Sequence, residues 1–293
     1  MEILSYGRAD SGRWLKQIAE SDWSAGRMLH QLLAEDRFHE HCGEAAQVLL
    51  LADGSRLAAF CAYMEQDEIP DPGLAPWLGF VYTFPEYRGR RLMGKLIAKA
   101  RELAREDGYD ALYISTEETG LYEKYGAEFQ SVMKERHGRD TRVYRMDTYG
   151  FAGWEQALAR AEDSGYPGIR TPKDLYNALW HVWSAETCAP RMRGDWSEDN
   201  RTLGQCSVTA FLAQDIFGGK VYGIPLEDGG FHCYNDADGC VFDLTSEQFA
   251  GRKLIYAGNP EQSRAVHFAK REKLERYESL RAALKAYTTG AAG

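Results

Sequence analysis

The chain has 293 residues, a length that suggests about two domains, and a formal net charge of −9. Its composition, 44% hydrophobic and 12% aromatic residues, excludes a mainly disordered chain. No apolar run approaches the roughly 18 residues of a membrane span, and the polar first residues do not fit a signal peptide. The negative charge argues against a nucleic-acid surface. We therefore expect a cytoplasmic protein that binds neither nucleic acid nor membrane.

The first 148 residues mix helical and extended patterns. Apolar residues recur at helical spacing through the first 40 residues, and two apolar runs around Asp53-Gly54 predict a hairpin. Residues 77–83 predict a strand, and a turn leads from it into a helix that begins near Leu92 and ends before Gly108. The remaining elements expected here are a strand at 111–115, a short helix at 120–126 and a strand at 142–147.

The second half reads as a small α+β region. Residues 149–170 are expected to be a linker with a polar helix over Trp154–Asp163. Thr171, followed by Pro172 and Asp174, has the pattern of a capped helix start. The other elements expected are helices at about 172–183, 204–219 and 271–287, strands at 220–224, 231–235 and 241–244, and turns at 228–230 and 238–239.

One stretch departs from the acidic average. Between Arg88 and Arg101 there are six basic residues and no acidic one. The stretch joins a predicted strand to a helix, and a helix start presents unpaired N–H groups and a positive dipole end that suit a pyrophosphate. Taken alone, however, such a charge run is more typical of a solvated helix face.

Three sequence blocks that occur in order favour the pyrophosphate site over the solvated helix face: WLGFVYTFPEYRGRRLMGKLI, ALYIS and TGLYEKYGAEF. Together they resemble the GNAT family of N-acetyltransferases over roughly residues 14–147. The family turn reads R-G-x-G-x-G or R-G-x-G-x-A, and Arg88 and Gly89 match it. Arg91 and Met93 stand where small residues are usual, and Gly94 falls one place later. These larger side chains either narrow the space that the backbone N–H groups of the turn offer to the phosphates, or, in the case of the arginine, add a phosphate contact.

The resemblance implies a mixed central sheet flanked by helices, acetyl-CoA as co-substrate, and acetyl transfer to the amine of a small molecule or peptide. The strand residues that would pair with the pantetheine arm are Phe80, Val81, Tyr82 and Thr83. The turn residues that would hold the pyrophosphate are Arg88, Gly89, Arg90, Arg91, Leu92, Met93, Gly94 and Lys95.

Tyr122 matches the family tyrosine that protonates the leaving thiolate, which makes it the expected general acid; without that context it fits a core aromatic. Acyl transfer to an amine also requires a proton acceptor. Glu68, Glu117 and Glu118 are candidates, as is a mediating water.

A second constellation consists of Cys206, His232 and Asp243. Cys206 lies at a predicted helix start, where the dipole favours a thiolate. If residues 236–239 form the hairpin loop, His232 lies opposite Asp243; if only 238–239 do, Tyr234 is opposite and His232 is diagonal on the same face. Either register gives the nucleophile, base and orienting group of a thiol enzyme. Each residue also fits a purely structural role.

We expect no metal site. Cys206, His232, Cys233 and Cys240 are the conceivable ligands, but Cys233 should point away from the face of His232, and no tight ligand pair occurs. The six cysteines include no CxxC pair, and a reducing compartment makes a disulfide framework unexpected.

The blocks WSAETCAP, DWSEDN, GQCSVTAFLAQDIFGG, GGFHCYN and DLTSEQF resemble the YunG-like family of small bacterial proteins over about 171–252. That resemblance implies no particular activity. The order of the Cys, His and Asp is analogous to papain-like and transglutaminase-like folds.

We therefore predict an α+β protein of two domains. Residues 1–148 would form a GNAT-like acetyl-CoA-binding domain, 149–170 a linker with a helix, and 171–293 a YunG-like domain in which a helix packs on a three-stranded antiparallel meander. The main function would be an acetyl-CoA-dependent N-acetyltransferase. The second domain would be either a thiol hydrolase, amidase or acyl transferase, or a non-catalytic ligand-binding module, and its C-terminal helix is compatible with a homodimer.

Overall fold

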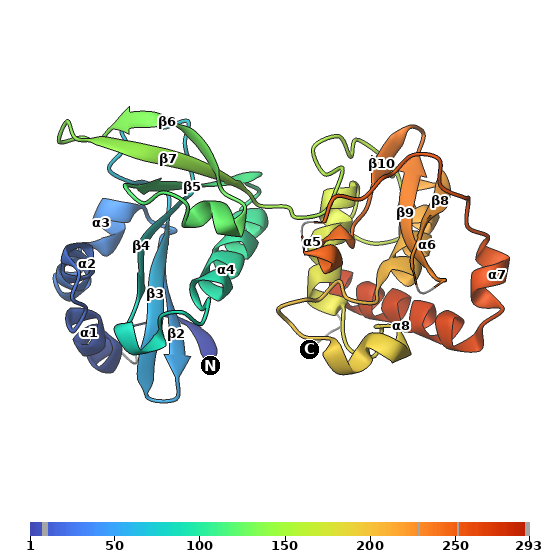
Figure 1. Ribbon diagram of the computed structural model, residues 1–293, viewed down its shortest axis with the longest axis horizontal. Coiled ribbons are helices and arrows are strands. Elements are labelled where there is room, and N and C mark those ends of the chain that lie inside the picture. Colours follow the sequence, from blue (N-terminus) through green and yellow to red (C-terminus); the bar gives the residue numbers. More distant parts are fainter. Residues whose placement is uncertain (8–10, 228, 251, 291–293) are drawn as a thin grey trace. The chain divides into compact units, whose positions relative to one another are not determined.

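A computed structural model describes residues 1–7, 11–227, 229–250 and 252–290 (Figure 1). The chain forms two compact units, Met1–Thr148 and Tyr149–Gly293, each with its own hydrophobic core. Asp228, part of the turn predicted at 228–230, lies outside the described residues. Among the helices described, none is long and apolar enough to cross a membrane.

The first unit is built on a seven-stranded mixed sheet with the order β1-β2-β3-β4-β5-β7-β6. Its strands are β1 (Glu2–Ser5), β2 (Gln47–Asp53), β3 (Arg56–Met64), β4 (Trp77–Thr83), β5 (Ala111–Thr116), β6 (Glu128–Lys134) and β7 (Asp140–Asp147). Neighbouring strands are antiparallel except β4 and β5, which are parallel and share one registered pair, Trp77 with Tyr113. The two strands therefore part beyond that pair.

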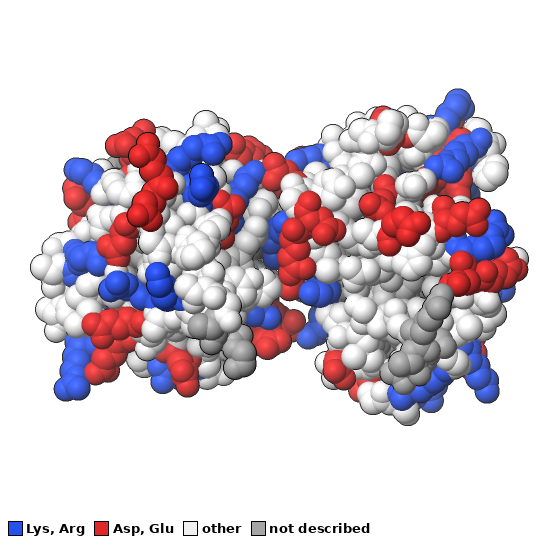
Figure 2. Space-filling view, turned by 180° about the vertical axis from the view of Figure 1, so that it is seen from behind, with Lys and Arg blue, Asp and Glu red and all other residues white. Residues whose placement is uncertain are grey.

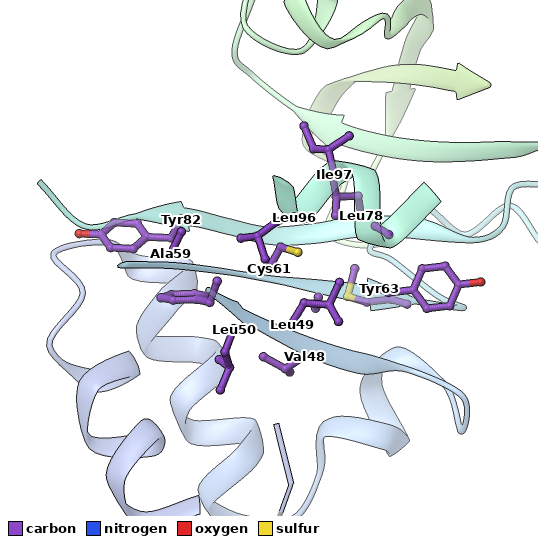
Figure 3. Packing of buried hydrophobic residues seen from close by; sticks show 14 of the residues in the cluster. Val48, Leu49, Leu50, Ala59, Cys61, Tyr63, Leu78, Tyr82, Leu96 and Ile97 are labelled. Carbon is purple, nitrogen blue, oxygen red and sulfur yellow. The ribbon is translucent and has the colours of Figure 1, made fainter. Parts of the chain in front are cut away.

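Helices cover both faces of this sheet (Figure 1). They are α1 (Ser11–Ala19), α2 (Ser24–Ala34), α3 (Phe38–Cys42) and α4 (Met93–Glu106). Figure 3 shows Leu96 and Ile97 of α4 on one side of the central strands, and Val48 and Leu50 of β2 on the other. The alternation of side chains along a strand allows one strand to supply both layers. This packing fixes the start of α4 beside the end of β4.

Two strands of the first unit were not predicted. β1 lies within the 40 residues expected to be helical, and β6 follows the short helix. β1 has only four residues and β6 is mostly exposed, with Phe129 and Val132 both turned to solvent. Both lie at sheet edges. An edge strand with little burial leaves a weak period-two signal in the sequence.

The second unit packs helices against a three-stranded antiparallel sheet with the order β10-β9-β8. The strands are β8 (Lys220–Pro225), β9 (Phe231–Ala237) and β10 (Cys240–Phe242), and the helices are α5 (Pro172–Val182), α6 (Cys206–Phe217), α7 (Arg264–Phe268) and α8 (Arg271–Thr288). α6 packs on β9, and α8 packs on α5 and α6. The capping box predicted at Thr171 is present, since Thr171 and Asp174 bond each other's backbone N–H.

The helix predicted over Trp154–Asp163 is wrong. The chain makes a turn at 153–156 and then runs without regular structure. Phe151, Ala157, Ala161 and Ile169 are buried in the core of the second unit. The segment 149–170 therefore follows the surface that buries it, and tertiary contacts override its local helical pattern.

The hairpin between β9 and β10 adopts the second of the two expected registers. Ala237 pairs with Cys240, so residues 238 and 239 alone form the loop. β10 ends at Phe242, and Asp243 instead forms an isolated antiparallel bridge with Ala152.

The surface charge of the molecule is mixed: Figure 2 shows acidic and basic side chains interspersed on the face that it draws.

Candidate functional site

A cavity of about 820 Å³ opens in the first unit where β4 and β5 part. Its walls come from β4, from the turn that precedes α4, and from residues 115–118 at the end of β5. The four strand residues singled out from the sequence, Phe80, Val81, Tyr82 and Thr83, all line it. The structure thus places the predicted strand and the predicted turn around one space.

The backbone of β4 is irregular at this cavity. The register between β3 and β4 shifts between Phe60 and Ala62, and Phe80 has a φ of 51°. Such a bulge takes backbone groups out of the ladder and re-aims them, and bulges are common beside active sites. On its other side β4 is registered with β5 only at Trp77. The cavity side of β4 can therefore accept an extended ligand as a further strand.

The turn before α4 presents the features of an anion site. Leu92 is the N-cap residue, and no side chain caps the helix there. The Gly94 and Lys95 N–H groups donate to the Arg91 and Leu92 carbonyl oxygens, at 3.1 Å each, and the positive end of the helix dipole faces the turn. Gly89 has a φ of 78° and Arg91 a φ of 55°, so an arginine adopts a left-handed conformation that favours glycine.

The arginines of this turn have different roles. Arg88 Nε donates to the Thr83 carbonyl oxygen at 3.0 Å, and its guanidinium lies 3.6 Å from an Asp22 carboxylate oxygen. Arg88 therefore fastens the turn to the end of β4. Arg90 and Arg91 are exposed, which leaves their charge accessible to a ligand. Arg91 also lines the cavity, together with Leu92 and Met93. Gly94 packs closely against Tyr125, because a Cβ added there would lie 3.0 Å from the Tyr125 ring.

Tyr122 lies on the 3-10 segment Tyr122–Tyr125, which ends at Gly126 as the sequence suggested. Its side chain is buried yet lines the cavity. Burial raises the pKa of its phenol well above the usual value, and the negative potential of Cys61 and Glu118 adds to this shift. The hydroxyl is therefore protonated at neutral pH.

The far end of the cavity is acidic. Asp67 and Glu68 follow β3 and so lie near the start of β4, whereas the basic turn follows its end. Burial raises the pKa of Asp67, although Ser115 Oγ donates to it at 2.5 Å. Of the three carboxylates considered from the sequence, Glu68 is 26% exposed and lies 3.3 Å from His41 Nε2, whereas Glu117 is 70% exposed and pairs with Arg139. Glu118 is also exposed.

Sequence reasoning missed Asp67. The only signal was its position beside Glu68 after an apolar strand, and such neighbouring acids are usually solvated. The donor that bonds to its carboxylate, Ser115, is 48 residues away along the chain.

In the second unit, the structure brings together the three residues of the second constellation. Cys206 is the first residue of α6 and is partly exposed. His232, on β9, and Asp243 are both buried, with His232 Nε2 2.6 Å from Asp243 Oδ2. Cys206 Sγ lies 3.9 Å from the carbonyl oxygen of Phe231, the residue before His232.

Hydrogen bonds hold the pKa of the Cys206 thiol well below its usual value. The Cys233 side chain contributes most to this shift; burial opposes it, and a hydrogen bond and positive charge from His232 strengthen it. Burial lowers the pKa of His232, but Asp243 and Cys206 outweigh that effect and raise it to about 10. The favoured state is a thiolate beside an imidazolium.

The expected separation of Cys233 from this group is wrong. The side chain and the backbone N–H of Cys233 both bond to Cys206, and this contact, together with burial, raises the pKa of the Cys233 thiol. Because α6 begins beside β9, Cys206 reaches two successive residues of that strand. The alternation of side chains along β9 therefore does not keep Cys233 away from Cys206. Cys240, at the start of β10, is a second partly exposed thiol.

A segment far away in sequence helps to fix Asp243. The Asp243 N–H donates to the Ala152 carbonyl oxygen at 2.9 Å, and the Ala152 N–H donates to Ser246 Oγ at 2.8 Å. Gly153 has a φ of 82°, and a Cβ there would lie 2.2 Å from the Val241 carbonyl oxygen. The residues assigned from the sequence to a linker therefore support the second constellation.

Comparison with known families gives one match for each unit. Residues 14–127 match the acetyltransferase (GNAT) family, and residues 171–289 match the family described as YunG protein. The chain joins a GNAT region to a YunG region. Both resemblances noted from the sequence are thereby confirmed, and the GNAT match supports an acetyltransferase.

Individual relatives cover parts of the chain. The uncharacterized protein YunG of Bacillus subtilis (strain 168) is 44% identical over 54 residues, 18% of this chain and 46% of that protein, so the chain spans about half the length of this curated relative. The ribosomal-protein-alanine N-acetyltransferase of Brucella melitensis is 21% identical, with a TM-score of 0.37, over 50% of this chain and 99% of that chain. The GNAT family N-acetyltransferase YhbS of Escherichia coli, solved in complex with CoA, is 17% identical, with a TM-score of 0.39, over 50% and 81% of the chains.

Proposed function

We propose that the first unit is an N-acetyltransferase that uses acetyl-CoA and acts on a cationic amine of a small molecule or peptide. The observation that carries the proposal is the convergence of parted strands and an uncapped helix start on one cavity. The match of residues 14–127 to the acetyltransferase family supports it.

The residues present fit acetyl-CoA. The bulged backbone of β4 at Phe80 and Val81 would pair with the pantetheine arm, and the turn from Arg88 to Lys95 would hold the pyrophosphate. Arg91 takes the left-handed conformation itself, so the turn keeps its path without the usual glycine. Arg91 adds positive charge where the family commonly has a small residue, and the exposed Arg90 adds a second charge beside it.

Acetyl-CoA would supply an activated thioester carbonyl. Tyr122, kept protonated by burial, would donate its proton to the leaving sulfur. Backbone N–H groups at the bulge of β4 would polarise the carbonyl oxygen. The amine would attack directly, and Glu68, the least exposed of the three carboxylates considered from the sequence, would accept its proton through water.

The acceptor class follows from the acidic end of the cavity. The carboxylates that line it are those of Asp67, Glu68, Glu117, Glu118 and Glu135, and Arg139 pairs with two of them. The excess of negative charge attracts a substrate of the opposite charge. A protonated amine is drawn to this end while the anionic cofactor is held at the basic turn.

Calorimetric titration of the full chain with acetyl-CoA tests the proposal. We expect binding that Arg90→Ala and Arg91→Ala each weaken about fivefold to tenfold, an effect of about 1 kcal/mol per lost charge contact. Lys134→Ala is the matched control, because it removes one exposed positive charge from β6 of the same unit. Absence of binding at millimolar acetyl-CoA, or equal losses in the control, would refute it.

A further inference from the structure

We propose that the second unit contains an independent thiol site for acyl transfer, in which Cys206 attacks the carbonyl carbon of an amide, ester or thioester, with His232 as the base and Asp243 as the orienting group. The proposal concerns a different unit and a nucleophile that the chain itself supplies, and it does not depend on the acetyltransferase activity.

The nucleophile is positioned at a helix start. Cys206 is the first residue of α6, and its N-cap residue Gln205 makes no side-chain cap. The N–H groups of the first turn are therefore available, and they stabilise a thiolate in the resting state. The same donors can bind the oxygen of a carbonyl under attack, as the oxyanion site of acyl transfer requires. Cys206 as a residue is partly exposed, and a substrate would approach the sulfur from that side.

The base is held by a fully bonded carboxylate. Besides His232, Asp243 accepts hydrogen bonds from the Thr245 N–H at 3.0 Å, from Thr245 Oγ1 at 3.2 Å and from the Tyr256 hydroxyl at 2.9 Å. These bonds fix its orientation in a buried place, where a carboxylate without partners would be costly. Because Nε2 of His232 faces Asp243, Nδ1 is the ring nitrogen left for Cys206.

Further groups border the ring and the sulfur. Gln248 Nε2 lies 3.3 Å from His232 Nδ1 and donates to the Thr245 carbonyl oxygen at 2.8 Å, and Phe249 packs edge-on against the imidazole. Arg276, which is buried, donates to the Gly204 carbonyl oxygen at 2.8 Å, close to Cys206 in the chain. These contacts restrict the ring to one orientation and place positive charge near the thiolate.

The chemistry balances without an external oxidant or reductant. The thiolate forms a C–S bond with the carbonyl carbon, and the bond from that carbon to the leaving nitrogen, oxygen or sulfur breaks. The leaving group takes the proton held by His232. In the second half, His232 removes a proton from water or another acceptor, the acceptor binds the acyl carbon, and the C–S bond breaks to restore the thiolate.

The contact between Cys233 and Cys206 raises a competing interpretation of the site. Its buried thiol bonds to Cys206, so the two sulfurs could instead act as a dithiol redox pair. In acyl transfer, Cys233 serves only as a donor to the thiolate, and a serine hydroxyl at this position would keep that bond. A redox pair requires both sulfur atoms.

The experiment uses the full chain and p-nitrophenyl acetate as the probe. We expect a burst of one p-nitrophenolate per chain, recovery of the acetyl group on the Cys206 peptide by mass spectrometry, and then slower turnover. Cys206→Ser should abolish the burst, and Cys240→Ser and Cys233→Ser should keep it. Loss of the burst in a folded Cys233→Ser variant, or equal labelling of Cys206 and Cys240, would overturn the proposal.

A measurement on the unaltered protein avoids variants that fail to fold. The rate of iodoacetamide alkylation at Cys206, followed peptide by peptide against pH, should be nearly flat through neutrality, while an ordinary thiol accelerates up to about pH 8.5. Cys240 provides the internal reference in the same sample. A Cys206 profile that rises through pH 8.5 would remove the activated nucleophile and with it the proposal.

Discussion

The two units build their candidate sites in opposite ways. In the first, strands part to leave a cavity of about 820 Å³, and the charged groups stand at its ends. In the second, buried groups form a continuous chain of hydrogen bonds behind Cys206, a partly exposed residue. The first site thus depends on a ligand to bring the reactive carbon and sulfur, whereas the second holds its reactive atom in the chain. Perturbing one site should leave the other intact.

The largest effect is expected from Tyr122→Phe. Loss of the proton donor should lower kcat by about 10²–10⁴-fold while acetyl-CoA binding is retained. Because the pKa of Tyr122 is raised, activity in the parent protein should not decline through deprotonation of this group up to about pH 10, the ordinary value for tyrosine. Thiol release from acetyl-CoA with cadaverine as the acceptor measures the rate.

Tyr113→Phe is the control for that change, because Tyr113 lies on β5 and its ring packs at a tilt against Trp77, outside the cavity lining. Equal rates in Tyr122→Phe and the parent protein would exclude Tyr122 as the acid. The esterase burst at Cys206 should be the same in both variants, which would show that the sites are separate.

A smaller effect is expected from Asp243→Asn. The carboxylate is one of the groups that raise the pKa of His232, so its loss lowers that pKa and reduces the positive charge that stabilises the Cys206 thiolate. The apparent pKa of Cys206 should rise by about one unit, and its alkylation rate below that pKa should fall about tenfold. Asparagine retains the shape and one acceptor oxygen for Thr245.

Circular dichroism would verify that the Asp243→Asn variant is folded, and Cys240→Ser in the same background would remove the other partly exposed cysteine. A folded variant whose alkylation profile against pH is unchanged would contradict the role given to Asp243. Acetyl-CoA binding should not respond to this substitution.

The smallest effect concerns the turn of the first unit. Arg91 adopts a φ of 55°, and a left-handed conformation costs a non-glycine residue about 1–2 kcal/mol. Glycine removes that cost but gives the unfolded chain more freedom, worth about 0.4–1 kcal/mol. Arg91→Gly should therefore raise the free energy of unfolding of the first unit by about 0.5 kcal/mol in chemical denaturation.

Arg90→Gly is the matched control, because Arg90 does not share the left-handed conformation and should gain nothing from glycine. Both variants lose one charge from the same turn, so both should bind acetyl-CoA more weakly. A loss of stability in Arg91→Gly equal to that in Arg90→Gly would show that the turn is not strained.

Elements with strong local chemistry could be predicted from the sequence. The hairpin at Asp53-Gly54 and the capped start of α5 at Thr171 depend on turn and cap residues that act on their immediate neighbours. β1 and β6 could not be predicted. β1 pairs with β2, more than 40 residues away, and β6, although it forms a hairpin with β7, is mostly exposed and leaves a weak period-two signal. The segment 154–163 was misjudged for a related reason: its alanines are buried by other parts of the second unit.

The candidate sites divide in the same way. Cys206 at a helix start and His232 near Asp243 follow from helix boundaries and strand alternation, which are local. The half-buried Asp67, the contact of Cys233 with Cys206 and the support of Asp243 by Ala152 all depend on how distant segments pack. Only the tertiary arrangement reveals them.

The bond between Ala152 and Asp243 shows that the segment matched by the family is shorter than the segment needed to hold the site in place. The family match begins at 171, yet the backbone that holds Asp243 lies at 150–153. A fragment beginning at Thr171 would expose the Asp243 N–H and the Ser246 hydroxyl that Ala152 now satisfies. A transplant of this region onto another partner therefore needs to carry the residues from Tyr149 onward to preserve the geometry around Cys206.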